Sequence, residues 1–225
     1  MARKPADQSV NREDIIAAAA DVLRYNGYDA TTMKDIAAKV NLTAASLYHH
    51  FKNKNFLLLA VLEAGLEVAI AELEPIRASD LSATEKLARM ITAHIVGVAD
   101  NTAVGAAMVF EIRSLMLAKL PPRNGGQFGE EEYAEFIARR DAFFARRAYF
   151  ERIFRDVIRE GIERGEFRQV DASIVAKTML GAHNWVGVWY KQGGRLSGQD
   201  IAQIIVETFL TSLKHSQSVQ TPLQA

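Results

Sequence analysis

The sequence predicts an all-α protein, in which a three-helix head precedes a helical bundle, with about nine helices in total. Three observations support this fold class. Apolar residues recur at helical spacing along almost the whole chain. No stretch alternates apolar and polar residues as a half-buried strand does, and no hairpin turn joins two such stretches. Gly, Pro, Asn and Asp residues interrupt the periodic stretches where helices commonly begin or end.

The composition excludes several classes of protein. No uninterrupted apolar run approaches the roughly 20 residues of a membrane span, and no apolar run follows the basic start, so we expect neither a membrane segment nor a signal peptide. The absence of cysteine excludes disulfides and thiol nucleophiles and is typical of a reducing cytoplasm. The net charge is zero, although residues 1–56 carry eight Lys or Arg against six Asp or Glu. That local excess is weak support for a nucleic-acid partner.

The first helix is predicted from about Val10 to Asn26, after a loose polar arm at residues 1–9. Gly27 follows as a residue that readily ends a helix. The apolar stripe of this helix consists of Ile15, Ile16, Ala19, Val22 and Leu23.

Residues 31–56 contain two short amphipathic segments separated by a tight turn. In the first, Met33, Ile36, Ala37 and Val40 form one apolar face. Asn41 tolerates the left-handed backbone that ends many helices, and Thr43 is a good N-cap for the second segment.

The second segment is expected to bury Leu47 and Phe51, together with His50 as a packed histidine. Small and polar side chains then face outward, which suits the floor of the DNA major groove because long acidic side chains would repel phosphate. Lys52 and Lys54 follow directly, and Asn53 can cap the next helix, so cations and a helix N-terminus converge where a phosphate would lie.

At these residues the chain resembles the TetR family of transcriptional repressors. The matching residues are Thr32, Ile36-Ala37, the run 47–51 (Leu-Tyr-His-His-Phe) and Lys54, whereas Asn41 stands where the family usually has Gly. The resemblance implies a helix-turn-helix that binds double-stranded DNA. The DNA-contacting residues that it indicates are Thr32, Thr43, Ala44, Ala45, Ser46, Tyr48, His49, Lys52 and Lys54.

Long helices follow the head. One is predicted from Lys54 to Pro75, and another from Thr84, with Leu87, Met90, Ile91, His94, Ile95 and Val98 on its apolar face. A third covers residues 104–120, and a loop at 121–126 ends it. A long aromatic helix is predicted from Gly129 to Arg164, and we expect its seven Arg between positions 139 and 159 to line a solvated, ion-paired face.

The last two helices favour a homodimer. Asp171 is predicted to cap one of them, and Ser197 with Asp200 forms a capping-box pattern at the other. Helix pairs from two subunits would make a four-helix interface, the arrangement that the TetR resemblance implies, although these helices could instead complete the core of one subunit. The candidate interface residues are Met179, Gly187, Trp189, Ile201, Ile204, Ile205 and Thr208.

Segments 110–115, 159–167 and 184–197 are similar to a branch of TetR-like proteins that regulates fatty-acid, phenylacetate and sterol-ring catabolism, many of whose members answer to acyl-CoA thioesters. Lys191-Gln192 departs from the Arg-Pro pair that is frequent there. A pocket for such an effector needs an apolar bore and a few polar groups. The candidates are Met90, His94, Met108, Phe144 and His183 for the bore, with Glu111 and Arg147 for a head group, unless these residues only pack the core.

The resulting hypothesis is a cytoplasmic, homodimeric repressor that a small hydrophobic effector, such as an acyl-CoA, releases from a palindromic operator. We expect no resident cofactor and no metal. The domains are residues 1–54 for DNA binding and 55–217 for the effector and dimerisation, followed by a tail at 218–225. A ligand-dependent activator or corepressor-type regulator, a helical acyl-thioester enzyme and a pure dimerisation module are the alternatives. The enzyme lacks support because no Cys, no G-x-S-x-G motif and no His/carboxylate constellation is present.

Overall fold

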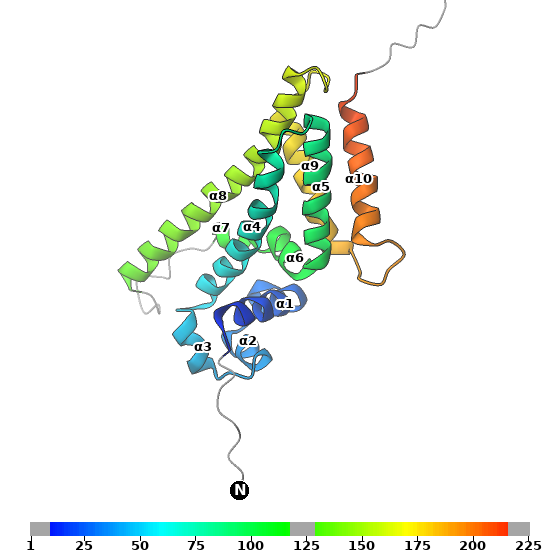
Figure 1. Cartoon of the computed structure of the whole chain (residues 1–225). Coiled ribbons are helices and arrows are strands. Elements are labelled where there is room, and N and C mark those ends of the chain that lie inside the picture. Colours follow the sequence, from blue (N-terminus) through cyan, green and yellow to red (C-terminus); the bar gives the residue numbers. More distant parts are fainter. Residues whose placement is uncertain (1–9, 118–128, 216–225) are drawn as a thin grey trace, which may run out of the picture.

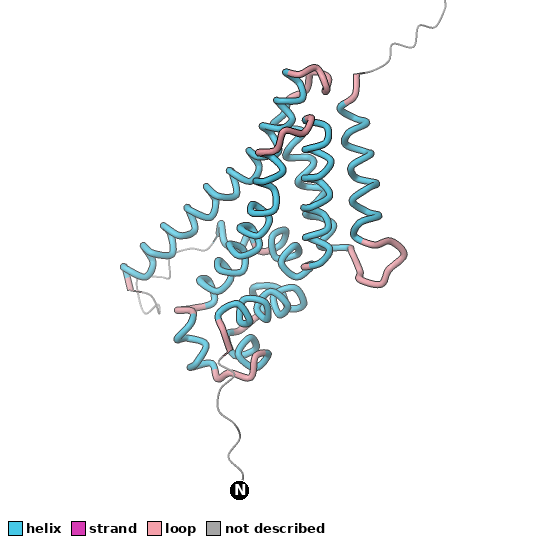
Figure 2. Tube along the Cα trace, in the orientation of Figure 1, coloured by secondary structure: helices cyan, strands magenta, loops and turns pink. Residues whose placement is uncertain are grey.

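The structure, a computed structural model, describes residues 10–117 and 129–215. These residues form ten α-helices and no strand, which confirms the all-α class (Figure 1, Figure 2). The arm at 1–9, the loop at 121–126 and the tail at 218–225 lie outside the described residues. The helices are α1 (Arg12–Ala30), α2 (Met33–Lys39), α3 (Ala44–His50), α4 (Lys54–Arg77), α5 (Ala83–Asp100), α6 (Thr102–Phe110), α7 (Ile112–Leu117), α8 (Glu130–Glu163), α9 (Ala172–Trp189) and α10 (Gly198–Leu213).

Helices α1 to α3 form a head at one end of the molecule (Figure 1). Asn11 caps α1 and Thr32 caps α2, each in a reciprocal capping box, and Thr43 caps α3 as predicted. The regular part of α1 ends at Gly27, whose φ of 71° suits glycine. The buried side chains of the head include Ile15, Leu23, Ile36, Leu47 and Phe51.

Helix α4 joins the head to the rest of the chain. Residues 56–62 are buried without interruption, and a helix buried over seven consecutive positions is covered on every side. Helix α1 covers it from the head, and α5, α6 and α8 cover it from the body. The prediction that α4 ends at Pro75 was wrong. Pro75 lies in the last turn, and the helix continues until the Ala78 amide donates to the Glu74 carbonyl, at 2.9 Å.

Helices α4 and α8 run side by side in the same direction (Figure 1). Polar side chains join them. Arg139 Nε lies 2.8 Å from Glu63 Oε1, and Arg146 Nε lies 2.7 Å from Glu67 Oε1. Further along, the Tyr149 hydroxyl donates to Glu74. Part of the arginine-rich face of α8 therefore pairs with carboxylates of α4, in addition to facing solvent.

Helices α5, α9 and α10 complete the body, and α9 packs against α6 at a close approach between glycines. A methyl group on Gly187 would lie 3.0 Å from the Cα atom of Gly105.

The single helix predicted over residues 104–120 is interrupted at Glu111 and forms two helices, α6 and α7. This interruption accounts for the one helix more than the nine predicted. The predicted apolar face of α5 is confirmed, since all six of its residues are buried.

Three predicted dimer residues are not available to a partner subunit. Met179, Gly187 and Ile201 are buried within the protomer, because α9 and α10 turn these faces toward the body. The sequence correctly places the apolar residues on helix faces but does not indicate which face the subunit itself covers. Ile204, Trp189 and Thr208 remain exposed, and Ile205 is half-buried.

Among the described residues, no single helix is long and apolar enough to cross a membrane. Helices α5 and α6 meet that test only as a pair, across a bend of 99°. Both helices contribute buried residues to the core.

Gly187→Ala should destabilise the fold by about 1 to 3 kcal/mol, because its methyl group would overlap the backbone of α6, which cannot move aside locally. Gly97→Ala is the matched control. Its methyl group would only touch the Glu72 carboxylate at 3.5 Å, and the better helix propensity of Ala should leave stability equal or raised by up to about 1 kcal/mol. Urea unfolding followed by circular dichroism measures both, and equal effects would refute the close-approach argument.

Candidate nucleic-acid interface and ligand cavity

The turn between α2 and α3 has the geometry of a helix-turn-helix. Asn41 adopts a φ of 56°, which confirms the predicted left-handed position. The Leu42 amide then donates to the Ala37 carbonyl at 2.8 Å, so the chain reverses within four residues. Leu47 is fully buried and fixes α3 on the head. This arrangement holds α3 as an outlying helix with one side free.

The outer face of α3 presents small and polar side chains. Thr43, Ala45, Tyr48 and His49 are exposed, whereas Ala44 and Ser46 are half-buried. The hydroxyls of Thr43 and Ser46 lie 2.9 Å apart, so each already has one partner. The prediction that His50 packs in the core was wrong, because the last turn of α3 projects it into solvent. The contacts of this face with DNA bases stay a prediction.

The predicted phosphate-binding residues already have partners within the protein. Lys52 pairs with Glu135 of α8, which raises the pKa of Lys52. The Thr32 hydroxyl donates to Asp35 Oδ2 at 2.7 Å within the capping box of α2. Each of these side chains is exposed, or half-exposed, and would exchange its partner on binding phosphate.

Lys54 has a structural role that the sequence reading did not include. Its ammonium donates to the carbonyls of Tyr28 at 2.7 Å and of Thr31 at 2.8 Å, and it lies 4.1 Å from the centre of the Tyr28 ring. The cation therefore neutralises the carbonyls at the end of α1, where the helix dipole is negative. Burial lowers the pKa of Lys54. Its phosphate contact stays a prediction beside this observed function.

Two cations of α2 were not singled out by the sequence reading. Lys34 and Lys39 are exposed and make no hydrogen bond or ion pair within the described residues. Their only signal in the sequence is that they lie off the apolar face of α2, which is also true of most surface lysines.

A cavity of about 300 Å³ lies between the head and the body. Side chains from α1, α4, α5, α6, α8 and α9 line it, and we call it the inner cavity. Its walls include residues that the sequence reading missed, because only the tertiary fold brings them together: Glu13, Ile16 and Ala17 of α1, Val104 of α6 and Asn184 of α9. A ligand there would contact the head directly through α1.

The structure brings only some of the predicted ligand residues to this cavity. His94, Met108 and Arg147 line it. Met90 and Phe144 pack elsewhere in the core, and Glu111 accepts a hydrogen bond from the Tyr28 amide, at 3.0 Å. These three do not line the inner cavity, because helical phase alone does not tell which of several buried positions faces an empty space.

His183 does not line the cavity itself but forms a hydrogen bond with His94, which does. The two Nδ1 atoms lie 3.2 Å apart, so one ring donates and the other accepts. Burial lowers the pKa of His94 to about 4, and burial together with the neighbouring His94 lowers the pKa of His183. Both rings are neutral at pH 7, which lets His94 offer a hydrogen bond to a ligand carbonyl without adding a buried charge. Among the described residues, no group of three metal-binding side chains is assembled.

Arg147 is an unpaired cation at the cavity. Its neighbour Arg146 pairs with Glu67, and Arg139 pairs with Glu63, but Arg147 makes no ion pair within the described residues. Asn184 of α9 and His94 of α5 line the same cavity. The site thus combines apolar walls, one free guanidinium and neutral hydrogen-bonding groups, which fits an apolar ligand with an anionic or carbonyl end.

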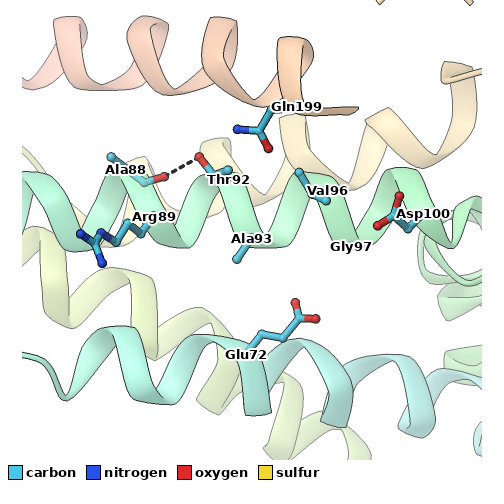
Figure 3. Close-up of a pocket in the computed structure, with 9 residues that line it drawn as sticks. All are labelled: Glu72, Ala88, Arg89, Thr92, Ala93, Val96, Gly97, Asp100 and Gln199. Atoms are coloured by element: carbon cyan, nitrogen blue, oxygen red, sulfur yellow. Dashed lines mark hydrogen bonds between the residues drawn. The ribbon is translucent and has the colours of Figure 1, made fainter. Parts of the chain in front are cut away.

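An open groove of about 590 Å³ adjoins the cavity on the outer side of α5. Figure 3 shows it between α4, which contributes Glu72, and the start of α10, which contributes Gln199. Glu72 and Gly97 line both spaces. Arg89 lies at one end of the groove and Asp100 near the other (Figure 3). A ligand too large for the cavity could extend along this groove.

Two polar contacts tie α1 to the segment that follows α5. The Tyr28 amide donates to Glu111 between α6 and α7, and Arg24 donates to the Thr102 hydroxyl at the start of α6. Since Val104 and Met108 of α6 line the cavity, a displacement of α6 would reach α1 through both contacts.

Two family descriptions match the chain. Residues 15–61 match bacterial regulatory proteins of the tetR family, and residues 124–213 match a tetracyclin repressor-like C-terminal domain. The HTH-type transcriptional repressor KstR2 of Mycolicibacterium smegmatis is 27% identical, over 95% of each chain.

Solved structures share the fold. The ketosteroid transcriptional regulator KstR2 of Mycobacterium tuberculosis superposes with a TM-score of 0.76 at 23% identity, covering 95% of this chain and 100% of that one. AibR, in complex with isovaleryl coenzyme A and operator DNA, superposes with a TM-score of 0.68 at 24% identity, covering 90% and 97%. Head and body together therefore have the overall fold of these structures.

Lys54→Met should destabilise the protein by about 1 to 2 kcal/mol, because the thioether covers the Tyr28 ring but cannot bond the carbonyls of α1. Lys39→Met removes an equal charge from an exposed site without such bonds and should change stability by less than about 0.5 kcal/mol. Thermal unfolding measured by calorimetry compares them. If the two variants lost the same stability, Lys54 would have no capping role.

His183→Asn should flatten the loss of stability with acid. Both histidine pKa values lie below the unfolded value of 6.5, so the pair is most stabilising above pH 6.5 and loses this stability as the pH falls toward about 4. His94 contributes up to about 1.4 kcal/mol per pH unit in that window, and the lowered pKa of His183 adds to the slope in the same direction. Asn keeps a hydrogen-bonding group near the Nδ1 position but does not titrate. Urea unfolding between pH 7.5 and 4.5 tests this, and parallel curves for variant and wild type would contradict it.

Proposed function

The chain belongs to the tetR family of bacterial regulatory proteins, and from this premise we propose that it is a homodimeric transcriptional repressor. A small apolar effector releases it from a palindromic operator. Repression is the proposed sign of regulation because the KstR2 relatives are named as repressors. Since a repressor acts on the chromosome, we place it in the cytoplasm. The named relatives are regulators, so neither an enzyme nor a pure dimerisation module is proposed.

The observation that carries this function is the position of the inner cavity. Its wall includes Ile16 and Ala17 of the head together with Arg147 and His94 of the body. A ligand bound there contacts the DNA-reading unit and the bundle at once, so its binding energy differs between head positions, as release requires. Thr43, Ala45, Ser46 and His49 are proposed to meet bases, with Tyr48 at the backbone.

We retain the proposed division of the chain at residues 54 and 55. The division falls at the first residue of α4, whose front end packs on the head and whose remaining turns pack in the body. The two units are therefore joined without a linker.

The dimer is proposed to form through the outward faces of α9 and α10. Six exposed large apolar residues lie on α6, α7, α9 and α10, and such surfaces are uncommon on monomers. The α9 stripe is Ile174, Trp185 and Trp189, at intervals that keep one face of the helix. Ile204 extends the surface on α10. Pairing these faces would set two recognition helices about 34 Å apart, one turn of DNA.

The effector class is proposed from the lining of the cavity. A volume of about 300 Å³ is at the small end for ligand sites, so it suits an acyl chain or ring rather than a whole nucleotide conjugate. Arg147 would meet a carboxylate or phosphate, and His94 a carbonyl. An acyl-CoA would place its acyl group inside and its polar arm along the outer groove toward Arg89. AibR, named with isovaleryl coenzyme A, is a precedent for that class.

Footprinting on the DNA upstream of its own gene tests the proposal. The protein should protect a palindromic segment, and a matching acyl-CoA from a panel of thioesters and free acids should release it. Arg147→Gln should raise the concentration needed for release about tenfold, because a charge-assisted hydrogen bond is lost, without changing operator affinity. Arg159→Gln is the control, since Arg159 is exposed on the same helix and does not line the cavity. Absence of any protected segment would refute the function, and equal behaviour of both variants would refute the role of Arg147.

A further inference from the structure

The N-terminal turns of α8 bind the short link between α3 and α4. Phe136 of α8 packs edge-to-face on Phe56 of α4, with ring centres 5.6 Å apart, and both are buried. Beside this apolar contact, Glu132 Oε1 accepts from the Asn53 side chain at 2.8 Å, and Glu135 pairs with Lys52. Two consecutive link residues are therefore bound to carboxylates of one distant helix.

Glu132 and Glu135 bind Asn53 and Lys52, two residues that are suited to contact a DNA phosphate. Lys52 follows the recognition helix directly, and Asn53 is the N-cap of α4, where backbone amides and a positive helix dipole favour anions. A carboxylate and a phosphate oxygen make the same kind of charge-assisted bond with an ammonium. One ammonium at the protein surface cannot serve both fully, so DNA must displace Glu135 to use Lys52.

We propose that Glu135, supported by Glu132, is an internal mimic of a DNA phosphate that weakens DNA binding by competing for Lys52. The inference rests on the proposed function. It identifies an autoinhibitory contact outside both the recognition face of α3 and the inner cavity.

The same helix also reaches the cavity. Arg147 lies twelve residues after Glu135, which is about 18 Å along a continuous helix, and Phe150 lines the cavity one turn further. The ion pairs between α8 and α4 hold the intervening turns together. A ligand that binds better when α8 is seated on α4 therefore favours the closed contact at Lys52, and by reciprocity DNA lowers the affinity of that ligand.

The exposure of the Lys52 and Glu135 side chains sets how much their ion pair can weaken DNA binding. Lys52 and Glu135 are each about half exposed (52% and 51%), and exposed pairs are weak and sensitive to salt. Neutralising Glu135 should therefore tighten DNA binding by about two- to fivefold at low salt. The gain should shrink as salt rises, because salt screens the competing pair in the wild-type protein.

The test is a double-mutant cycle measured by fluorescence anisotropy on a labelled duplex carrying the footprinted segment, over a range of salt concentrations. The variants are Glu135→Gln, Lys52→Gln and the double variant. Glu131→Gln is the matched control, since Glu131 is exposed one turn before Glu135 on α8 and makes no hydrogen bond or ion pair within the described residues.

Glu135→Gln should bind more tightly than both the wild type and Glu131→Gln, and in the Lys52→Gln background it should gain no more than the control. Equal gains for Glu135→Gln and Glu131→Gln would overturn the inference, because general charge repulsion would then explain both. So would a gain that persists without Lys52. A wild-type protein that binds the duplex while Glu135→Gln is unchanged would overturn this inference alone, whereas a wild type that binds no DNA would overturn the proposed function as well.

Discussion

The fold depends on the burial of residues 56–62 of α4 on every side. A helix surrounded in this way needs neighbours on every side, and taken over its whole length α4 contacts α1 of the head and α5, α6 and α8 of the body. Head and body consequently share one core and cannot be packed independently. A change in the packing of the body around α4 must be accommodated by the head, and this requirement makes a ligand cavity between them an effective place for control.

Some of the positive charge near the recognition helix is balanced within the protein itself. The chain has no net charge, and two cations that follow the recognition helix already have partners within the protein: Lys52 pairs with Glu135, and Lys54 bonds the carbonyls that end α1. The attraction to DNA is therefore local and short-ranged rather than a field of the whole molecule. Two arginines of α8, Arg139 and Arg146, pair with carboxylates of α4, whereas Arg147 lines the cavity and makes no ion pair within the described residues.

Local signals account for what could be predicted from the sequence. Asn41 and Ser197 mark a turn and a helix start through conformational preference and capping, which depend only on near neighbours. The candidate sites, in contrast, are built from residues that lie far apart in the sequence. Lys54 meets carbonyls 23 and 26 positions earlier in the chain, Gly187 faces α6 instead of a partner subunit, and Glu13 of the first helix lines a cavity made mostly by the body. Periodicity identifies which positions are buried but not which helix, partner or empty space each of them faces.

The central claim is that filling the inner cavity moves the heads relative to the body, and the distance between the two heads of a dimer measures this most directly. Because the chain has no cysteine, Lys39→Cys places a single spin label on α2, and Gln169→Cys places a reference label between α8 and α9. Double electron–electron resonance should give a narrow distribution of head-to-head distances on operator DNA. This distribution should shift or broaden when the effector is added, while the distance between the reference labels stays constant. An unchanged head-to-head distance with effector bound and DNA released would contradict the account.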